Sequence, residues 1–191
     1  HMAQMRNIFA AIRFAVDAMG ELKNSALYAT ELLDMTAYYL YQLAWYFEAK
    51  AVHHHREAIQ ALDLDHREDA QRAQSALREA GRSALESWDS LAVVYGPRDD
   101  YSLQYSAETM QNAGPVLDGF LDWFIAQSTE YYHGYPLCSS REEVHFFLRP
   151  QCEQLLEQLD EAVACRTPYE GGETARWYWY DFPREWKALV Y

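Results

Sequence analysis

Three consecutive histidines, His53, His54 and His55, are the first side chains whose type suggests chemistry. Glu57 and His66 follow closely, and imidazole with carboxylate is a ligand set that transition metals accept. Successive residues of a helix point about 100° apart, so the three rings cannot reach one ion. By a seven-residue count only His54 faces a neighbouring helix. We therefore interpret these histidines as ordinary helix-surface and helix-contact side chains, with a metal site as the alternative.

A second candidate for metal chemistry is the pair Glu130 and His133, spaced as Glu-x-x-His. On a helix of a bundle such a pair is half of a di-iron carboxylate site. A complete site needs a second such pair and two further glutamates, and the sequence offers the spacing again only in an expected turn. The segment also has polar residues on one face and aromatic residues on the other, which is typical of a solvated helix. His54, Glu130 and His133 are thus metal ligands only under the alternative.

Motifs for nucleophilic catalysis or phosphate binding are absent from the sequence. It contains no Gly-x-Ser-x-Gly elbow, no P-loop and no dinucleotide-binding glycine pattern. None of the cysteines, Cys138, Cys152 and Cys165, lies in a local catalytic signature. We therefore favour a protein without enzymatic activity.

The last stretch of the chain, from residue 169 onwards, is crowded with aromatic and acidic side chains. Trp and Tyr dominate the energetic hot spots of protein interfaces, and acidic neighbours complement a basic partner. The alternative is that these rings close the core of a helical bundle. The side chains that we expect to bind a partner are Glu170, Glu173, Trp177, Trp179, Asp181 and Trp186.

The charge of the chain is strongly negative and unevenly distributed. The formal net charge is −13, of which residues 1–98 contribute −3 and residues 99–191 contribute −10. Such a surface repels a phosphate backbone, so we expect no direct nucleic-acid binding. We expect instead a basic protein or a nucleic-acid-processing complex as the partner. Negative charge also maintains solubility, which is the alternative explanation.

Cysteine usage and hydropathy both favour the cytoplasm. Three cysteines cannot all pair, and no Cys-x-x-Cys spacing occurs, so we expect free thiols in a reducing compartment. No secretory signal is recognisable and charges interrupt every long apolar stretch, so we expect no membrane contact. We take His1 and Met2 as a cloning remnant and the start methionine.

The apolar periodicity predicts helices throughout the first half of the chain. Residues 3–20 are expected to form an amphipathic helix, and Ser25 is suited to cap the next helix. Alanine and leucine then recur every seventh residue through residues 26–95, with a short break near residue 64. Two long helices joined by a short turn must be antiparallel. Asp65 with Glu68 resembles a capping box at the start of the second helix.

The second half contains clear helix boundaries. Gly96-Pro97 ends the long pair, a short helix is expected near residues 101–111, and Pro115 opens a helix that continues to residue 133. Ser140 and Glu143 form a capping-box pattern for a helix of residues 141–165, kinked at Pro150. We predict an all-α chain, with residues 3–191 in a single domain. Its architecture is a bundle of six or seven helices built on a long antiparallel, alanine-rich helical hairpin at about residues 26–95.

Two functional hypotheses from different classes remain. We favour a non-enzymatic acidic module that inhibits or neutralises a basic macromolecular partner, comparable to immunity proteins that neutralise toxins or to phage-encoded inhibitors. The alternative is a metal-dependent enzyme or metal-binding protein whose cofactor is a divalent transition metal. The sequence indicates no oligomeric state.

Overall fold

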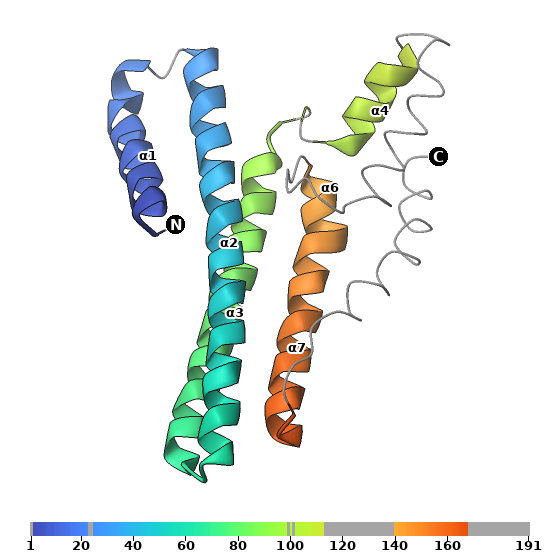
Figure 1. Ribbon diagram of the computed structural model, residues 1–191. Coiled ribbons are helices and arrows are strands. Elements are labelled where there is room, and N and C mark those ends of the chain that lie inside the picture. Colours follow the sequence, from blue (N-terminus) through green and yellow to red (C-terminus); the bar gives the residue numbers. More distant parts are fainter. Residues whose placement is uncertain (1, 23–24, 99, 101, 113–139, 168–191) are drawn as a thin grey trace.

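The computed structural model describes residues 2–22, 25–98, 100, 102–112 and 140–167 (Figure 1). All regular secondary structure within these residues is helical, which confirms the all-α prediction. None of the helices in this part of the chain is both long and apolar enough to cross a bilayer. In chain order the elements are α1 (Met2–Leu22), α2 (Ala26–Asp63), α3 (Arg67–Tyr95), α4 (Leu103–Asn112), α6 (Arg141–Glu143), the π-helical turn η3 (Val144–Leu148) and α7 (Arg149–Cys165).

Helix α1 lies beside the N-terminal half of α2 (Figure 1). Met5 is buried at this contact, and the Phe9 ring stacks on Tyr39 with 5.6 Å between centroids. Phe9, Val16 and Met19, which the periodicity places on the apolar face, remain between 44 % and 49 % exposed. One neighbouring helix is too narrow to cover the whole apolar face of α1.

Helices α2 and α3 lie side by side along most of their length (Figure 1). Their contact follows the seven-residue repeat, because Ala44, Ala51 and Ala58 of α2 and Ala84 and Leu91 of α3 are completely buried. Alanine side chains are short, so the two backbones can approach closely along this repeat.

The turn between α2 and α3 differs from the predicted capping box. Asp65 has a left-handed backbone, with φ of 59°. The N–H groups of Asp65 and His66 donate to the carbonyl oxygens of Leu62 and Ala61 at 3.1 and 2.8 Å, which is a Schellman termination of α2. The N-cap of α3 is His66, whose side chain makes no capping bond. The prediction that Asp65 and Glu68 cap α3 was wrong, because Asp65 ends α2 instead.

The predicted capping box at Ser140 is confirmed. The Ser140 hydroxyl accepts a hydrogen bond from the Glu143 N–H, and the Glu143 carboxylate accepts one from the Ser140 N–H, both at 3.2 Å. The interruption expected at Pro150 takes the form of a π-helical turn just before it, where the Arg149 N–H donates to the Val144 carbonyl. Proline crowds the carbonyl four residues earlier, and a π turn removes that conflict.

Helix α7 packs against both α2 and α3 and forms the core of the described residues together with them (Figure 1). Buried side chains form two clusters along the three helices. The tryptophan cluster consists of Ala37, Tyr41, Ala44, Ala84, Trp88, Leu91, Tyr95, Val144, Leu148 and Cys152. The alanine cluster, nearer the α2–α3 turn, consists of Ala51, Ala58, Leu77, Ala80, Leu159 and Val163.

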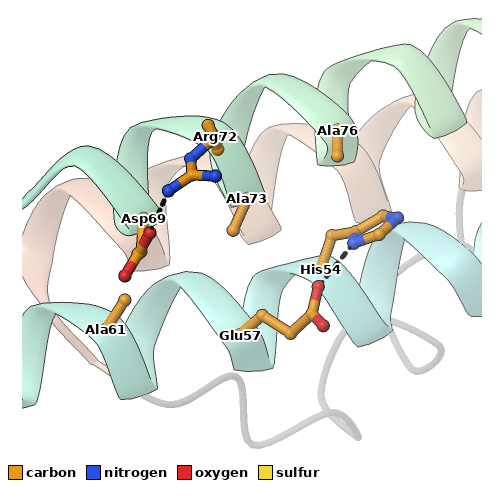
Figure 2. Close-up of a pocket in the computed structure, with 7 residues that line it drawn as sticks. All are labelled: His54, Glu57, Ala61, Asp69, Arg72, Ala73 and Ala76. Carbon is orange, nitrogen blue, oxygen red and sulfur yellow. Dashed lines mark hydrogen bonds and ion pairs between the residues drawn. The ribbon is translucent and has the colours of Figure 1, made fainter. Parts of the chain in front are cut away.

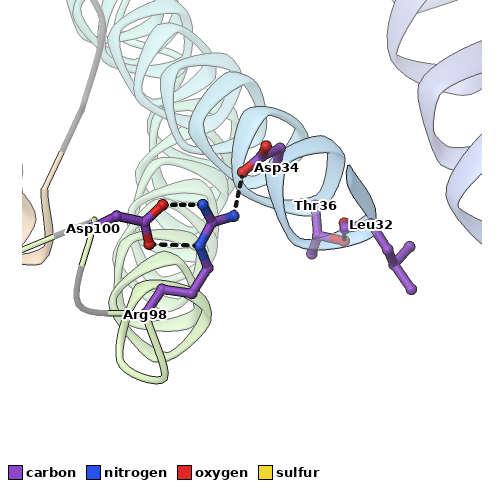
Figure 3. Close-up of polar contacts among 5 residues, drawn as sticks. All are labelled: Leu32, Asp34, Thr36, Arg98 and Asp100. Atoms are coloured by element: carbon purple, nitrogen blue, oxygen red, sulfur yellow. Dashed lines mark hydrogen bonds and ion pairs between the residues drawn. The ribbon is translucent and has the colours of Figure 1, made fainter. Parts of the chain in front are cut away.

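One arginine connects the segment after α3 to α2 (Figure 3). Arg98 donates from Nη1 to Asp34 Oδ1 and from Nε to Asp100 Oδ1, each at 2.8 Å. Only 18 % of the Arg98 side chain is exposed, so this pairing is better shielded than an ordinary surface ion pair. It fixes the end of α3 against the first half of α2.

Candidate functional site

A groove of about 350 Å³ opens between α2 and α3 close to their connecting turn (Figure 2). Alanines from both helices point between the helices here, and because their side chains are short they leave this space unfilled. Charged side chains from each helix stand around it. The lining residues are His54, Glu57, Ala61, Asp69, Arg72, Ala73 and Ala76.

On the α2 side of the groove, two histidines hold the carboxylate of Glu57. Its Oε2 lies 2.7 Å from His54 Nδ1, and its Oε1 lies 3.3 Å from His53 Nε2. The hydrogen bond with His54 is the main cause that lowers the pKa of Glu57, and the nearby ring of His53 adds to it. The Glu57 side chain is 48 % exposed. Glu57 therefore presents an ionised carboxylate to the groove.

On the α3 side, Arg72 pairs with Asp69 one turn earlier on the same helix (Figure 2). The side chains of Arg72 and Asp69 are 78 % and 53 % exposed. An ion pair this exposed contributes at most about 1 kcal/mol, because solvent screens it and both side chains lose mobility. Either member can therefore exchange its partner for another ion at little cost.

A second polar cluster lies inside the core, where Trp88 Nε1 donates to Glu48 Oε1 at 2.8 Å and the Cys152 thiol also bonds this carboxyl. Glu48 is 8 % exposed, and Trp88 and Cys152 are almost completely buried. Burial raises the pKa of Glu48 against the opposing effect of these two hydrogen bonds. Burial and the adjacent Glu48 also raise the pKa of Cys152. A thiol in this state is a poor nucleophile, so the cluster serves packing rather than catalysis.

The histidines are arranged differently from the prediction. His55 is buried, and its Nδ1 lies 3.2 Å from the Leu159 carbonyl oxygen of α7. Burial lowers the pKa of His55. The second buried series on α2 is Tyr41, Glu48 and His55 rather than the neighbouring series that contains His54. Helix α7 covers this flank of α2, and the sequence does not reveal which flank it covers.

Most of the predicted site residues lie outside the described part of the chain. Of the predicted metal ligands, only His54 is described, and it contacts Glu57. Among the described residues, no group of three or more His, Cys, Asp or Glu side chains is placed to hold a metal ion. Predicted site residues outside the described part are Glu130, His133, Glu170, Glu173, Trp177, Trp179, Asp181 and Trp186.

Comparison with known proteins does not assign a family. No protein-family model matches the chain, and no curated protein or solved structure shows significant similarity to it. The geometry and charge of the chain itself are therefore the basis for inferring its function. In the described part of the chain, those features are an all-helical architecture and a groove flanked by carboxylates between two long helices.

Proposed function

We propose that this chain is a non-enzymatic acidic module that inhibits or neutralises a basic macromolecular partner, comparable to immunity proteins or phage-encoded inhibitors. The observation that carries the proposal is the distribution of charge over the described helices. The described residues contain 21 of the 29 acidic side chains and 12 of the 16 basic ones. Of the 21 acidic side chains only Glu48 and Glu143 are buried, so the excess negative charge lies at the surface.

Ion pairs within the chain already engage half of the described basic residues. Arg78 pairs with Asp160 at 2.9 Å and Arg149 with Asp89 at 2.5 Å, both between α3 and α7. These arginines are therefore less available to an acidic ligand. The exposed carboxylates that form no ion pair within the described residues include Glu68, Glu79, Glu86, Glu157 and Glu161.

A surface of this kind acts mainly on the rate at which partners meet. Long-range attraction speeds association with a basic protein and weakens as salt is added. The same field repels a phosphate backbone, which supports a protein partner over direct nucleic-acid binding. The aromatic side chains from residue 169 onwards would then slow dissociation, because buried aromatic anchors act mainly on the dissociation rate.

The proposal extends to the complete chain. Residues 3–191 form a single domain, a bundle of six or seven helices built on the antiparallel hairpin of α2 and α3. Its partner-binding residues are Glu170, Glu173, Trp177, Trp179, Asp181 and Trp186. It works in the cytoplasm, without membrane contact, on a basic protein or a nucleic-acid-processing complex.

Affinity capture with the full chain as bait tests this function. We expect a basic protein to bind from the native cell lysate at low salt and to leave at high salt, and its activity to disappear when purified chain is added. Substituting Glu79, Glu86, Glu157 and Glu161 together with glutamine should reduce capture, because it removes surface charge and leaves the core unchanged. A captured protein that is acidic, or whose activity the chain does not change, would contradict the proposal.

Metal analysis of the purified chain separates this function from the metal-dependent alternative. The proposal expects no stoichiometric metal. Stoichiometric iron, manganese or zinc that is lost when Glu130 and His133 are replaced by alanine would favour the alternative.

A further inference from the structure

The groove between α2 and α3 has the size and lining of a site for one extended side chain. Its volume of about 350 Å³ is at the small end of the range of about 300–1,000 Å³ that is typical of ligand pockets. Ala61, Ala73 and Ala76 give it an apolar lining that suits a chain of methylene groups. Charged side chains from both helices line the same groove (Figure 2).

The charges of the groove favour a cation. Glu57 on α2 and Asp69 on α3 place a half-exposed carboxylate on each side. The low pKa of Glu57 keeps its carboxylate ionised. The two carboxylates outnumber Arg72, the one arginine in the lining, so a cation meets more opposite charge here than an anion does.

Among cationic side chains, arginine fits this arrangement best. Its guanidinium is planar, carries five N–H donors and is more weakly hydrated than the ammonium group of lysine, so it can bond two carboxylates at once. Arg72 shows that a guanidinium is accepted at this place, since it already pairs with Asp69 (Figure 2). Because that pair is highly exposed, an incoming arginine can share or replace it at little cost.

We infer that this groove binds an arginine side chain of the basic partner, an inference that rests on the proposed function. The methylene stem lies against Ala61 and Ala73, and the guanidinium lies between Glu57 and Asp69. The groove then supplies one specific contact within an association that surface charge otherwise drives without regard to sequence.

Nuclear magnetic resonance of the ¹⁵N-labelled full chain tests this inference directly. The probes are the capped tripeptides Gly-Arg-Gly and Gly-Gln-Gly and, separately, inorganic phosphate. We expect the arginine peptide to shift the backbone amides of the groove residues and the glutamine peptide to leave them unchanged. Glu57→Gln or Asp69→Asn should weaken arginine binding roughly tenfold, since each removes a hydrogen bond to a charged group.

Two further variants separate the groove from general electrostatic attraction. Ala73→Leu fills the space without changing the charge, and we expect it to abolish the shifts. The matched control is Glu21→Gln with Glu31→Gln, which removes two exposed carboxylates of α1 and α2 outside the groove and should leave binding of the arginine peptide as in the wild type. Far-ultraviolet circular dichroism checks folding. If Ala73→Leu unfolds the chain, the exposed substitution Glu57→Gln decides the question.

Three results would overturn the inference. They are equal weakening by the groove and control variants, equal binding of the glutamine peptide, and shifts with phosphate but none with arginine. These results leave the proposed function intact if wild-type chain still captures and inhibits a basic protein in a salt-dependent way. Failure of that capture would instead count against the proposed function.

Discussion

Glu48 and Glu57 lie nine residues apart on the same helix, yet their surroundings shift the pKa of their carboxyl groups in opposite directions. Glu48 is buried against Trp88 and Cys152, and burial raises its pKa. Glu57 stands half exposed beside the groove, and the hydrogen bond with His54 lowers its pKa. Helix α7 causes this difference in pKa, because it packs over Glu48 and leaves Glu57 exposed. One residue type on one helix is therefore structural at the first position and available to a ligand at the second.

Replacing Trp88 with alanine should have the largest effect on the buried side of this comparison. It removes a fully buried indole and one of the two hydrogen-bond donors to the Glu48 carboxyl, the other being the Cys152 thiol. We expect the free energy of unfolding to fall by about 3–5 kcal/mol in urea denaturation. Trp45→Ala is the matched control, because Trp45 packs on Trp88 but is 41 % exposed. Equal losses for the two variants would contradict the buried role of Trp88.

A smaller loss is expected where α2 and α3 meet through alanine. Ala51 is completely buried in the alanine cluster, so Ala51→Leu should overpack it and cost about 1–3 kcal/mol. Ala49→Leu places the same side chain at an exposed position two residues earlier and should change stability little. Thermal unfolding of both variants provides the measurement. Identical melting temperatures would show that the helices do not pack closely at Ala51.

The sequence contained enough local information to locate most of the described helices. Ser25 and the Ser140–Glu143 pair were recognisable because their capping bonds involve residues only three apart. The alanine repeat on α2 was recognisable because it continues over four heptads. The turn at Asp65 was misread, because an aspartate can both end one helix and begin the next.

The surroundings of Glu48 and His55 could not be predicted, because they depend on α7, about 100 residues later in the chain. A seven-residue count identifies the flank that meets α3 but contains no information on which flank a third helix covers. Gly81 was an available signal. A side-chain carbon there would lie 2.8 Å from Leu156 Cδ2, so this glycine lets α7 approach α3. His54 and Glu57, which line the α2 side of the groove, were recognisable as candidates from the sequence, but none of the residues that line its α3 side were.

The pH dependence of stability should separate the two glutamates by sign, with a smaller effect than either core substitution. The stability that Glu48 contributes is complete below its unfolded pKa, near 4.5, and is lost as pH rises towards its raised folded pKa. Glu48→Gln should therefore gain stability relative to the wild type over that range. Glu57 behaves in the opposite way, since its contribution is lost as pH falls through its lowered folded pKa. Urea denaturation at pH values on both sides of 4.5 measures how the stability contribution of each glutamate changes with pH. Contributions that change with the same sign would contradict the comparison.

The central claim, that this acidic surface recognises a basic partner, is tested most directly by association kinetics at increasing salt. We predict fast association that slows steeply with salt. Neutralising Glu170, Glu173 and Asp181 should make association slower and less dependent on salt. Trp179→Ala or Trp186→Ala should instead accelerate dissociation, at a cost of about 2 kcal/mol or more for a hot spot. An association rate constant that changes neither with salt nor with these charge substitutions would contradict the claim.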